Sequence, residues 1–177
     1  MNKLKPLCID LDGTLINEDV TLKASKIYLE RHFFNVLRMF FWLFLGRAYF
    51  KQKLSESVEL DPQSLRYNEK FLEFVLKKKE EGHKIFLATA SNQIYANKIA
   101  DYLGIFDGIF ASTCHVNLRG KIKARALVMI FGENGFIYAG NSIDDVHIWN
   151  KSAECILVSP TKKTLKRMHG QKYLLFE

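Results

Sequence analysis

Two carboxylates close an apolar segment near the N-terminus. Pro6 precedes a short apolar run over residues 7–9, Asp10 and Asp12 follow, and Gly13 comes next, so the pattern predicts a buried strand and a turn. Side chains alternate along a strand, which sends both carboxylates to one face. Gly13 permits a sharp turn, so the pair would lie at the strand's carboxyl end, where open α/β sheets bind ligands. Like charges this close need a cation or a shared proton. The spacing therefore favours a catalytic or metal site over a simple Asp-Gly turn.

The run from Asp10 to Thr14 (Asp-Leu-Asp-Gly-Thr) resembles the first motif of the haloacid dehalogenase (HAD) superfamily, whose members are mostly Mg²⁺-dependent phosphohydrolases. The resemblance implies that Asp10 attacks phosphorus and forms an aspartyl-phosphate. It implies that Asp12 acts first as an acid and then as a base. A true dehalogenase would not normally carry the second aspartate, so Asp12 favours phosphoryl chemistry. Gly13 and Thr14 are assigned to substrate binding.

A second set of polar residues follows the apolar strand predicted over residues 85–88. The sequence Thr89-Ala90-Ser91-Asn92 resembles the second HAD motif, in which a hydroxyl bonds a phosphoryl oxygen, and Thr89 is the best match. Ala90, Ser91 and Asn92 are expected to bind substrate through a hydroxyl and through backbone N–H groups at the next helix start. Capping of that helix is the alternative role for Ser91.

A lysine stands between the second and the fourth of these segments. Residues 118–123 (Leu-Arg-Gly-Lys-Ile-Lys) resemble the third HAD motif, whose lysine pairs with the nucleophile and with a phosphoryl oxygen. The Gly-x-x-Lys spacing indicates Lys123 as this catalytic lysine, with Lys121 as the alternative. Arg119 is expected to help attract anions.

The fourth segment begins after an apolar strand predicted over residues 136–139. Its sequence, Gly-Asn-Ser-Ile-Asp-Asp over residues 140–145, resembles the HAD motif that completes the Mg²⁺ site. Asn141 replaces the first acid of that motif, and Asp145 matches the second. An amide oxygen can ligate Mg²⁺ but brings no charge, so weak metal binding is expected. The resemblance implies Mg²⁺ ligation by Asp10, Asp12, Asn141 and Asp145, whereas Asp144 fits a helix start.

The elements that must position these residues alternate between strands and helices. This alternation predicts a three-layer, Rossmann-like α/β fold with a central parallel sheet. The four motifs follow four strands and can therefore meet at one edge of the sheet. Residues 1–20 and 63–177 are predicted to form the core domain, and residues 21–62 a small helical cap inserted after the first strand. The C-terminal residues 173–176 are either a short strand or the start of a linker.

The predicted cap contains an unusually apolar helix within residues 33–50. Its apolar run ends at Gly46 and is too short to span a bilayer. Three arrangements fit the pattern: a cap helix packed on the main domain, a dimer contact, or an interfacial helix. In the interfacial arrangement Trp42 and the other aromatic residues contact lipid, with the cations Arg38, Arg47, Lys51 and Lys53 near headgroups.

The composition narrows the protein class. The formal charge of +7 over 177 residues predicts affinity for anions, either phosphorylated substrates or an acidic membrane surface. No nucleic-acid motif is present, so nucleic acid is not an expected partner. The three cysteines are odd in number and widely spaced, which favours reduced thiols and a cytoplasmic protein, free or peripheral at the membrane.

A closer resemblance covers most of the chain. Five segments are similar to the HAD domain fused N-terminally to UbiA-type membrane prenyltransferases, namely residues 46–54, 67–69, 87–91, 117–120 and 138–142. The sequence therefore predicts a Mg²⁺-dependent phosphatase. Its expected substrate is a phosphorylated metabolite, a phosphoprotein or a membrane-linked head group. The alternative is a membrane- or partner-docking module with weak or vestigial catalysis.

Overall fold

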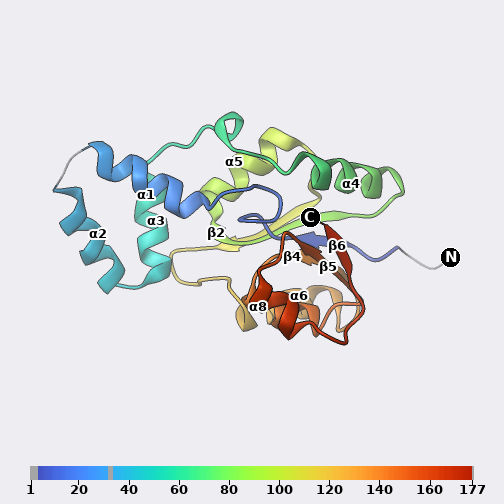
Figure 1. Ribbon diagram of the computed structural model, residues 1–177. Coiled ribbons are helices and arrows are strands. Elements are labelled where there is room, and N and C mark those ends of the chain that lie inside the picture. The colour runs from blue at the N-terminus through green and yellow to red at the C-terminus, as the bar shows by residue number, and fades with distance from the viewer. Residues whose placement is uncertain (1–3, 32–33, 177) are drawn as a thin grey trace.

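A six-stranded parallel sheet forms the centre of the molecule (Figure 1). The computed structural model describes residues 4–31 and 34–176. The strands stand in the order β3-β2-β1-β4-β5-β6. Their bounds are Leu7–Ile9 for β1, Ile85–Asn92 for β2, Gly108–Ser112 for β3, Ile137–Gly140 for β4, Glu154–Val158 for β5 and Leu174–Phe176 for β6. The chain leaves β1 toward β2 on one side and later returns to β4 on the other, so the reversal in strand order falls beside β1. A reversal of this kind opens a crevice at the carboxyl ends of the strands.

Helices cover both faces of the sheet. Their bounds are Val20–Arg31 for α1, Asn35–Phe44 for α2, Arg47–Ser57 for α3, Glu69–Glu80 for α4, Gln93–Leu103 for α5, Lys121–Phe131 for α6, Val146–Trp149 for α7 and Lys162–Arg167 for α8, with 3₁₀ turns η1 at Pro62–Ser64 and η2 at Ile143–Asp145. Leu7 and Ile9 belong to the core on the α4 and α5 side, while Cys8 belongs to the core on the α6 and α7 side. The strands are therefore buried on both faces. This three-layer arrangement confirms the predicted fold class.

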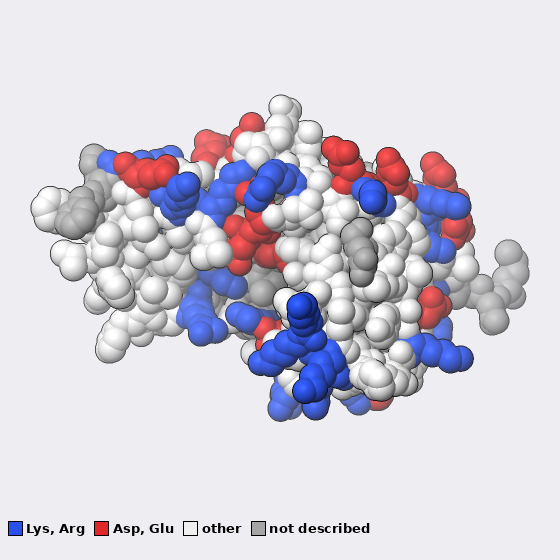
Figure 2. All heavy atoms as spheres, viewed as in Figure 1, with Lys and Arg blue, Asp and Glu red and all other residues white. Residues whose placement is uncertain are grey.

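The helices α1, α2 and α3 lie between β1 and β2 in the sequence and form one end of the molecule (Figure 1). The buried Phe50 and Leu54 of α3 join the main hydrophobic core, so this end is continuous with the sheet layers. Figure 2 shows few charges over α2 on the face in view. The division into a core of residues 1–20 and 63–177 and a cap of residues 21–62 stays a prediction.

One detail differs from the sequence-based expectation, and one open alternative is settled. The strand predicted to end at Ala88 continues to Asn92, with an irregularity in its pairing to β3 between Ala88 and Asn92. The C-terminal segment, for which a strand or a linker was expected, forms the edge strand β6 parallel to β5. Among the described residues, no helix has both the length and the apolar character needed to cross a membrane.

The interfacial arrangement predicted for the apolar helix needs two corrections. Trp42 is 8% exposed and packs on Tyr28, with 5.2 Å between ring centroids, so it is not a lipid-facing residue. The Lys51 ammonium lies 2.6 Å from the Ala90 carbonyl oxygen and lines a pocket, so it is not free to reach headgroups. Both side chains point inward because α1 and the sheet offer them partners that a sequence pattern does not reveal.

Candidate active site

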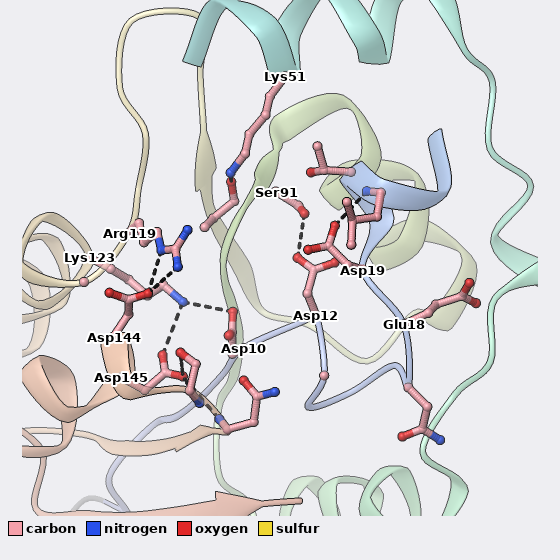
Figure 3. Close-up of a pocket in the computed structure, with 18 residues that line it drawn as sticks. Asp10, Asp12, Glu18, Asp19, Lys51, Ser91, Arg119, Lys123, Asp144 and Asp145 are labelled. Carbon is pink, nitrogen blue, oxygen red and sulfur yellow. Dashed lines mark hydrogen bonds and ion pairs between the residues drawn. The ribbon is translucent and has the colours of Figure 1, made fainter. Parts of the chain in front are cut away.

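A pocket of about 490 Å³ lies beyond the carboxyl ends of the central strands (Figure 3). The loops after β1 and β4, the end of β2, the start of α6 and residues of α1 and α3 contribute to its wall. Six acidic side chains line it, against three basic ones. The acids are Asp10, Asp12, Glu18, Asp19, Asp144 and Asp145, and the bases are Lys51, Arg119 and Lys123. The excess of carboxylates favours a bound cation, and the bases favour an anionic group beside it.

A buried network surrounds Asp10 at the floor of the pocket. The Lys123 ammonium donates to Asp10 Oδ1 at 2.9 Å and to the Tyr138 hydroxyl at 2.9 Å. The Tyr138 hydroxyl donates in turn to Asp145 Oδ1 at 2.8 Å. Lys123 and Asp145 are almost fully buried, so the network fixes the orientation of the lysine. Lys123, and not the exposed Lys121, therefore meets the first carboxylate as predicted.

Burial sets the protonation of this network. Loss of water raises the pKa of Asp10 to about 7, against the opposing charge of Lys123, and Asp145 and Asp12 push it in the same upward direction. Burial disfavours the charged form of Lys123, but the nearby Asp10 and Asp145 carboxylates outweigh this and raise its pKa. The charged form of Lys123 is thus favoured beside the Asp10 carboxyl.

Asp12 has a different set of partners. Its Oδ1 accepts from the backbone N–H of Val20 at 2.7 Å, and its Oδ2 accepts from the Ser91 hydroxyl at 2.6 Å. Figure 3 shows Asp10 pointing toward Lys123 and Asp12 pointing toward Ser91. Burial raises the pKa of Asp12, and Asp19 adds to this, while the bonds from Ser91 and Val20 oppose it. The two carboxylates are therefore held separately in one pocket.

The turn after Asp12 brings the β1 and β4 loops together. Gly13 has a φ of +73°, a backbone conformation that side chains disfavour. A Cβ atom at Gly13 would lie 2.1 Å from Asn141 Nδ2, so a larger residue would displace the Asn141 amide. Gly13 and Asn141 both line the pocket. The glycine therefore lets the Asn141 amide pack against the Asp12–Gly13 turn.

Asp145 has its oxygens engaged by the protein. In addition to Tyr138 on Oδ1, its Oδ2 accepts from the Ser142 hydroxyl at 2.8 Å and from the backbone N–H groups of Ser142 and Asn141 at 2.9 and 3.2 Å. These bonds close the loop after β4 and cap η2. The network therefore orients Asp145 toward Lys123, with 3.8 Å between Nζ and Oδ1.

Three residues predicted for the site lie outside the pocket lining. Thr89 is fully buried, and its hydroxyl accepts from the backbone N–H of Ser91 at 2.9 Å. Thr14 is also fully buried, and its hydroxyl has no hydrogen-bond partner within the described ranges 4–31 and 34–176. Asn92 bonds Gln52 and Ser55 of α3 and caps α5, so it joins the end of β2 to α3. Ala90 and Ser91 of the same segment do line the pocket.

The sequence-based prediction missed Tyr138 and Asp19, and it placed Lys51 near lipid headgroups instead of in the site. Tyr138 contributes its hydroxyl from the buried strand β4. Buried tyrosines usually hydrogen-bond to a polar partner, so a tyrosine in a predicted core strand is a signal that could have indicated this residue. Asp19 lines the pocket from the start of α1, and its position only seven residues after Asp12 is a weak hint. Lys51 enters from α3, and burial lowers its pKa while Asp12 and Asp19 oppose this. No sequence signal separates Lys51 from the other lysines of the insertion.

Arg119 and Asp144 form a pair at the rim of the pocket. The Arg119 Nε donates to Asp144 Oδ2 at 2.7 Å, and both side chains keep contact with solvent. Asp144 therefore does more than begin a helix, because it holds the guanidinium beside the entrance. Pairs this exposed contribute little to stability, so positioning is their main effect.

Comparison with known proteins shows the family and the fold of the chain. Residues 7–147 match the family of haloacid dehalogenase-like hydrolases (HAD). Uncharacterized protein y4nM of Sinorhizobium fredii (strain NBRC 101917 / NGR234) is 35% identical over 156 residues, which cover 86% of this chain and 30% of that protein. The chain thus spans less than a third of the length of this curated relative.

Two solved structures are similar in fold. A substrate-bound phosphoserine phosphatase has a TM-score of 0.71 at 18% identity, covering 100% of this chain and 94% of that one. A protein of unknown function from Bordetella pertussis Tohama I has a TM-score of 0.72 at 13% identity, covering 97% of each chain. The family match extends over most of the chain and includes Asp10, Lys123 and Asn141, so the chain belongs to the haloacid dehalogenase-like hydrolase superfamily.

Proposed function

We propose that the protein is a Mg²⁺-dependent phosphatase that hydrolyses phosphomonoesters through an aspartyl-phosphate on Asp10. The observation that carries this proposal is the 2.9 Å pairing of the buried Asp10 with Lys123, beside a second carboxylate, Asp12, that has other partners. Two carboxylates in different environments suit two different roles. Membership in the HAD-like hydrolases supports the same reaction class.

In the proposed first step, the Asp10 oxygen that is not bonded to Lys123 attacks phosphorus. The bond between phosphorus and the ester oxygen breaks, and the Asp12 carboxyl gives its proton to that leaving oxygen. The raised pKa of Asp12 helps it to keep this proton until it is needed. Lys123 stabilises the negative charge on the transferring group, since it is already fixed in place.

In the second step, Asp12 takes a proton from a water molecule, and the water oxygen attacks phosphorus. The bond from phosphorus to Asp10 breaks, which releases inorganic phosphate and restores both aspartates. Ser91 and the Val20 N–H hold Asp12 through their bonds of 2.6 and 2.7 Å, so the same group can serve both steps.

The residues of the pocket fit a Mg²⁺ ion of low affinity. Within the described part of the chain, no group of three or more His, Cys, Asp and Glu side chains is arranged to hold a metal. The proposed donors are instead the Asp10 carboxylate, the Asp12 carbonyl and the Asn141 amide oxygen, which are the oxygen ligands that Mg²⁺ prefers. Asp145 would support them from behind, because its oxygens already accept bonds from Tyr138, Ser142 and Asn141. When bound, Mg²⁺ would offset negative charge on the phosphoryl group.

The substrate proposed is a phosphomonoester, whether a metabolite, a phosphoprotein or a membrane-linked head group. The three cysteines are free, which supports a cytoplasmic location for this activity. The likeness to HAD domains of UbiA-type fusion proteins stays a prediction. The phosphatase named among the structural neighbours shares only 18% identity, so it suggests a reaction class and not a substrate.

Hydrolysis of p-nitrophenyl phosphate tests the proposal, measured with Mg²⁺ and with a chelator. Asp10→Asn keeps the shape of the side chain and removes the attacking charge, so turnover should fall by roughly 10³-fold or more. Asp101→Asn, on the exposed surface of α5, is the matched control and should behave as wild type. Wild-type turnover in Asp10→Asn would refute the mechanism. Absence of turnover in the wild type across several divalent metals would favour a docking module with vestigial catalysis.

Asn141 provides a separate test of the metal site. Asn141→Asp adds a carboxylate where an amide stands, so Mg²⁺ should reach half-maximal activation at a lower concentration. Turnover at saturating Mg²⁺ should change less than this concentration does. Coincident activation curves for the two proteins would remove Asn141 from the proposed metal ligands.

A further inference from the structure

The helix α2 presents an uncovered apolar face at the end of the molecule. Five large side chains form what we call the outer face of α2, namely Leu37, Phe40, Phe41, Phe44 and Leu45. Their exposed fractions run from 49% at Leu45 to 88% at Phe44. At 100° per residue these five positions fall within one arc of the helix and contain no charge, while the buried Asn35 and Trp42 fall on the opposite side.

The surroundings of this face are basic. Between Glu30 and Glu56 the sequence holds five Lys and Arg residues and no acid. Arg38 follows Leu37 on α2, Arg47 begins α3 two residues after Leu45, and both arginines are exposed. The nearest acids in sequence are already paired, Glu30 with Lys26 at 4.0 Å and Glu56 with Lys53 at 2.8 Å. An apolar face edged by unopposed cations therefore characterises this end of the molecule, which is largely white over α2 in Figure 2.

We propose that the outer face of α2 docks on an anionic lipid surface. An amphipathic helix with aromatic and leucine side chains on one face and arginines at its edge matches the composition of interfacial helices. The helix has ten residues and is therefore about 15 Å long, which suits lying in the headgroup plane and not crossing the bilayer. Arg38 and Arg47 would contact lipid phosphates while the phenylalanines enter the acyl boundary.

A second copy of the chain fits this face less well. A twofold dimer would place the same arginines of both copies near one shared interface, without an acid from residues 31–55 to pair with them. The five side chains expose roughly 670 Å², taking about 200 Å² for a fully exposed large side chain. Two copies would then bury roughly 1,300 Å², near the lower end of the range for a stable interface. An anionic membrane instead attracts the arginines and accepts the apolar side chains without a matching surface.

This docking is independent of the proposed phosphatase activity. The helix α3 lies next in the chain and carries Lys51 into the pocket, so α2 can enter a membrane while the pocket keeps its wall. The basic residues of α8, such as Lys163 and Lys166, are a second possible source of attraction to anionic lipid. The experiment must therefore separate apolar insertion from general charge.

Co-sedimentation of the full chain with phosphatidylcholine vesicles, with and without phosphatidylglycerol, tests the proposal. The wild type should pellet with the anionic vesicles, and added salt should weaken this binding. Phe41→Ser with Phe44→Ser keeps every charge, so its partition coefficient should fall by roughly tenfold or more through loss of apolar burial alone. The matched control is Met129→Ser with Ile130→Ser, which removes two exposed apolar side chains from α6 and should bind as wild type.

Three results would overturn the proposal. The first is equal pelleting of the wild type and the Phe41, Phe44 variant, which assigns binding to charge alone, including that of α8. The second is equal pelleting with neutral and anionic vesicles. The third is a wild-type dimer in sedimentation velocity that the same double variant converts to monomer, which makes a second copy the occupant. Circular dichroism of each variant checks that the fold is retained.

Discussion

The neighbouring helices α2 and α3 have almost the same length, but in each of them the burial is the opposite of what its apolar content would suggest. The helix α2 is the more apolar of the two, yet most of its large side chains are exposed. The helix α3 is polar over most of its length, yet it is anchored on the sheet layers. Apolar content alone therefore does not decide which helix is buried. Burial of a helix depends on whether neighbouring elements offer contacts to its side chains.

The contacts of α3 explain this difference. Leu54 is fully buried in the main core, while Ser55 and Gln52 bond both ends of the Asn92 amide, at 3.0 and 2.8 Å. The Lys51 ammonium bonds the Ala90 carbonyl and, at 3.2 Å, Asn117 Oδ1. These polar side chains are satisfied by groups at the end of β2, so burial costs them little.

Among the described residues, the main contacts of α2 are with its neighbours α1 and α3. The Asn35 amide donates to the Tyr28 carbonyl at 2.7 Å, and Trp42 packs on the Tyr28 ring. No comparable anchor in the described residues covers the opposite side of the helix, where the outer face lies. The comparison assigns α3 to the site and α2 to the surface.

The largest expected effect concerns two leucines. Leu54→Ala on α3 removes a fully buried side chain and should lower the free energy of unfolding by about 2–5 kcal/mol. Leu37→Ala on α2 removes a side chain that is 69% exposed and should change it by less than about 0.5 kcal/mol. Urea denaturation of both variants measures the difference. Similar losses from the two leucines would contradict the assignment of α2 to the surface.

The next effect concerns two lysines of α3. Lys51→Met should lower kcat/KM for a phosphomonoester by about 10- to 100-fold, because the pocket loses a positioned cation worth about 1.5–3 kcal/mol toward a charged partner. Lys53→Met, whose lysine pairs with Glu56 away from the pocket, is the control and should leave kcat/KM unchanged. If both variants lose activity equally, Lys51 acts through helix stability and not through the site.

A smaller effect tests the polar attachment of the inserted helices. The buried Tyr95 hydroxyl donates to the carbonyls of Val58 at 2.9 Å and Leu54 at 3.3 Å. Tyr95→Phe should therefore destabilise the fold by about 1 kcal/mol, since it leaves buried carbonyls with one donor fewer. Tyr102→Phe, at a residue that is 48% exposed, serves as the comparison and should be nearly neutral. Thermal denaturation of the pair gives the result.

The smallest effect concerns the outer face of α2 itself. Phe44 is 88% exposed, so Phe44→Ala should change the free energy of unfolding by no more than about 0.5 kcal/mol in the absence of lipid. The measurement is chemical denaturation at several protein concentrations. A loss that grows with protein concentration would indicate that a second copy covers this face in solution.

The fold class and the positions of most catalytic candidates could be predicted from local sequence patterns. Apolar strands followed by Asp10 and Asn141 are local patterns, and the carboxyl ends of parallel strands necessarily share one edge. The predicted catalytic hydroxyl of Thr89 is instead buried outside the pocket lining, whereas Ser91 of the same segment lines the pocket. The choice of Lys123 over Lys121 also followed from local spacing, and the structure places its ammonium on Asp10. Local sequence was sufficient to predict these positions because each residue lies within a few positions of a strand end or a helix start.

The contacts between distant segments depend on tertiary packing, which local sequence patterns do not specify. Lys51 reaches the pocket because α3 packs beside the end of β2, and Tyr138 joins the site because Lys123 and Asp145 converge on its hydroxyl. Asn92 was assigned to substrate by its neighbours in sequence, but its amide is occupied by α3. The exposure of α2 likewise depends on what packs against each side of it. Hydrophobic periodicity reports which face of a helix is apolar, whereas burial depends on whether another element lies close enough to cover that face.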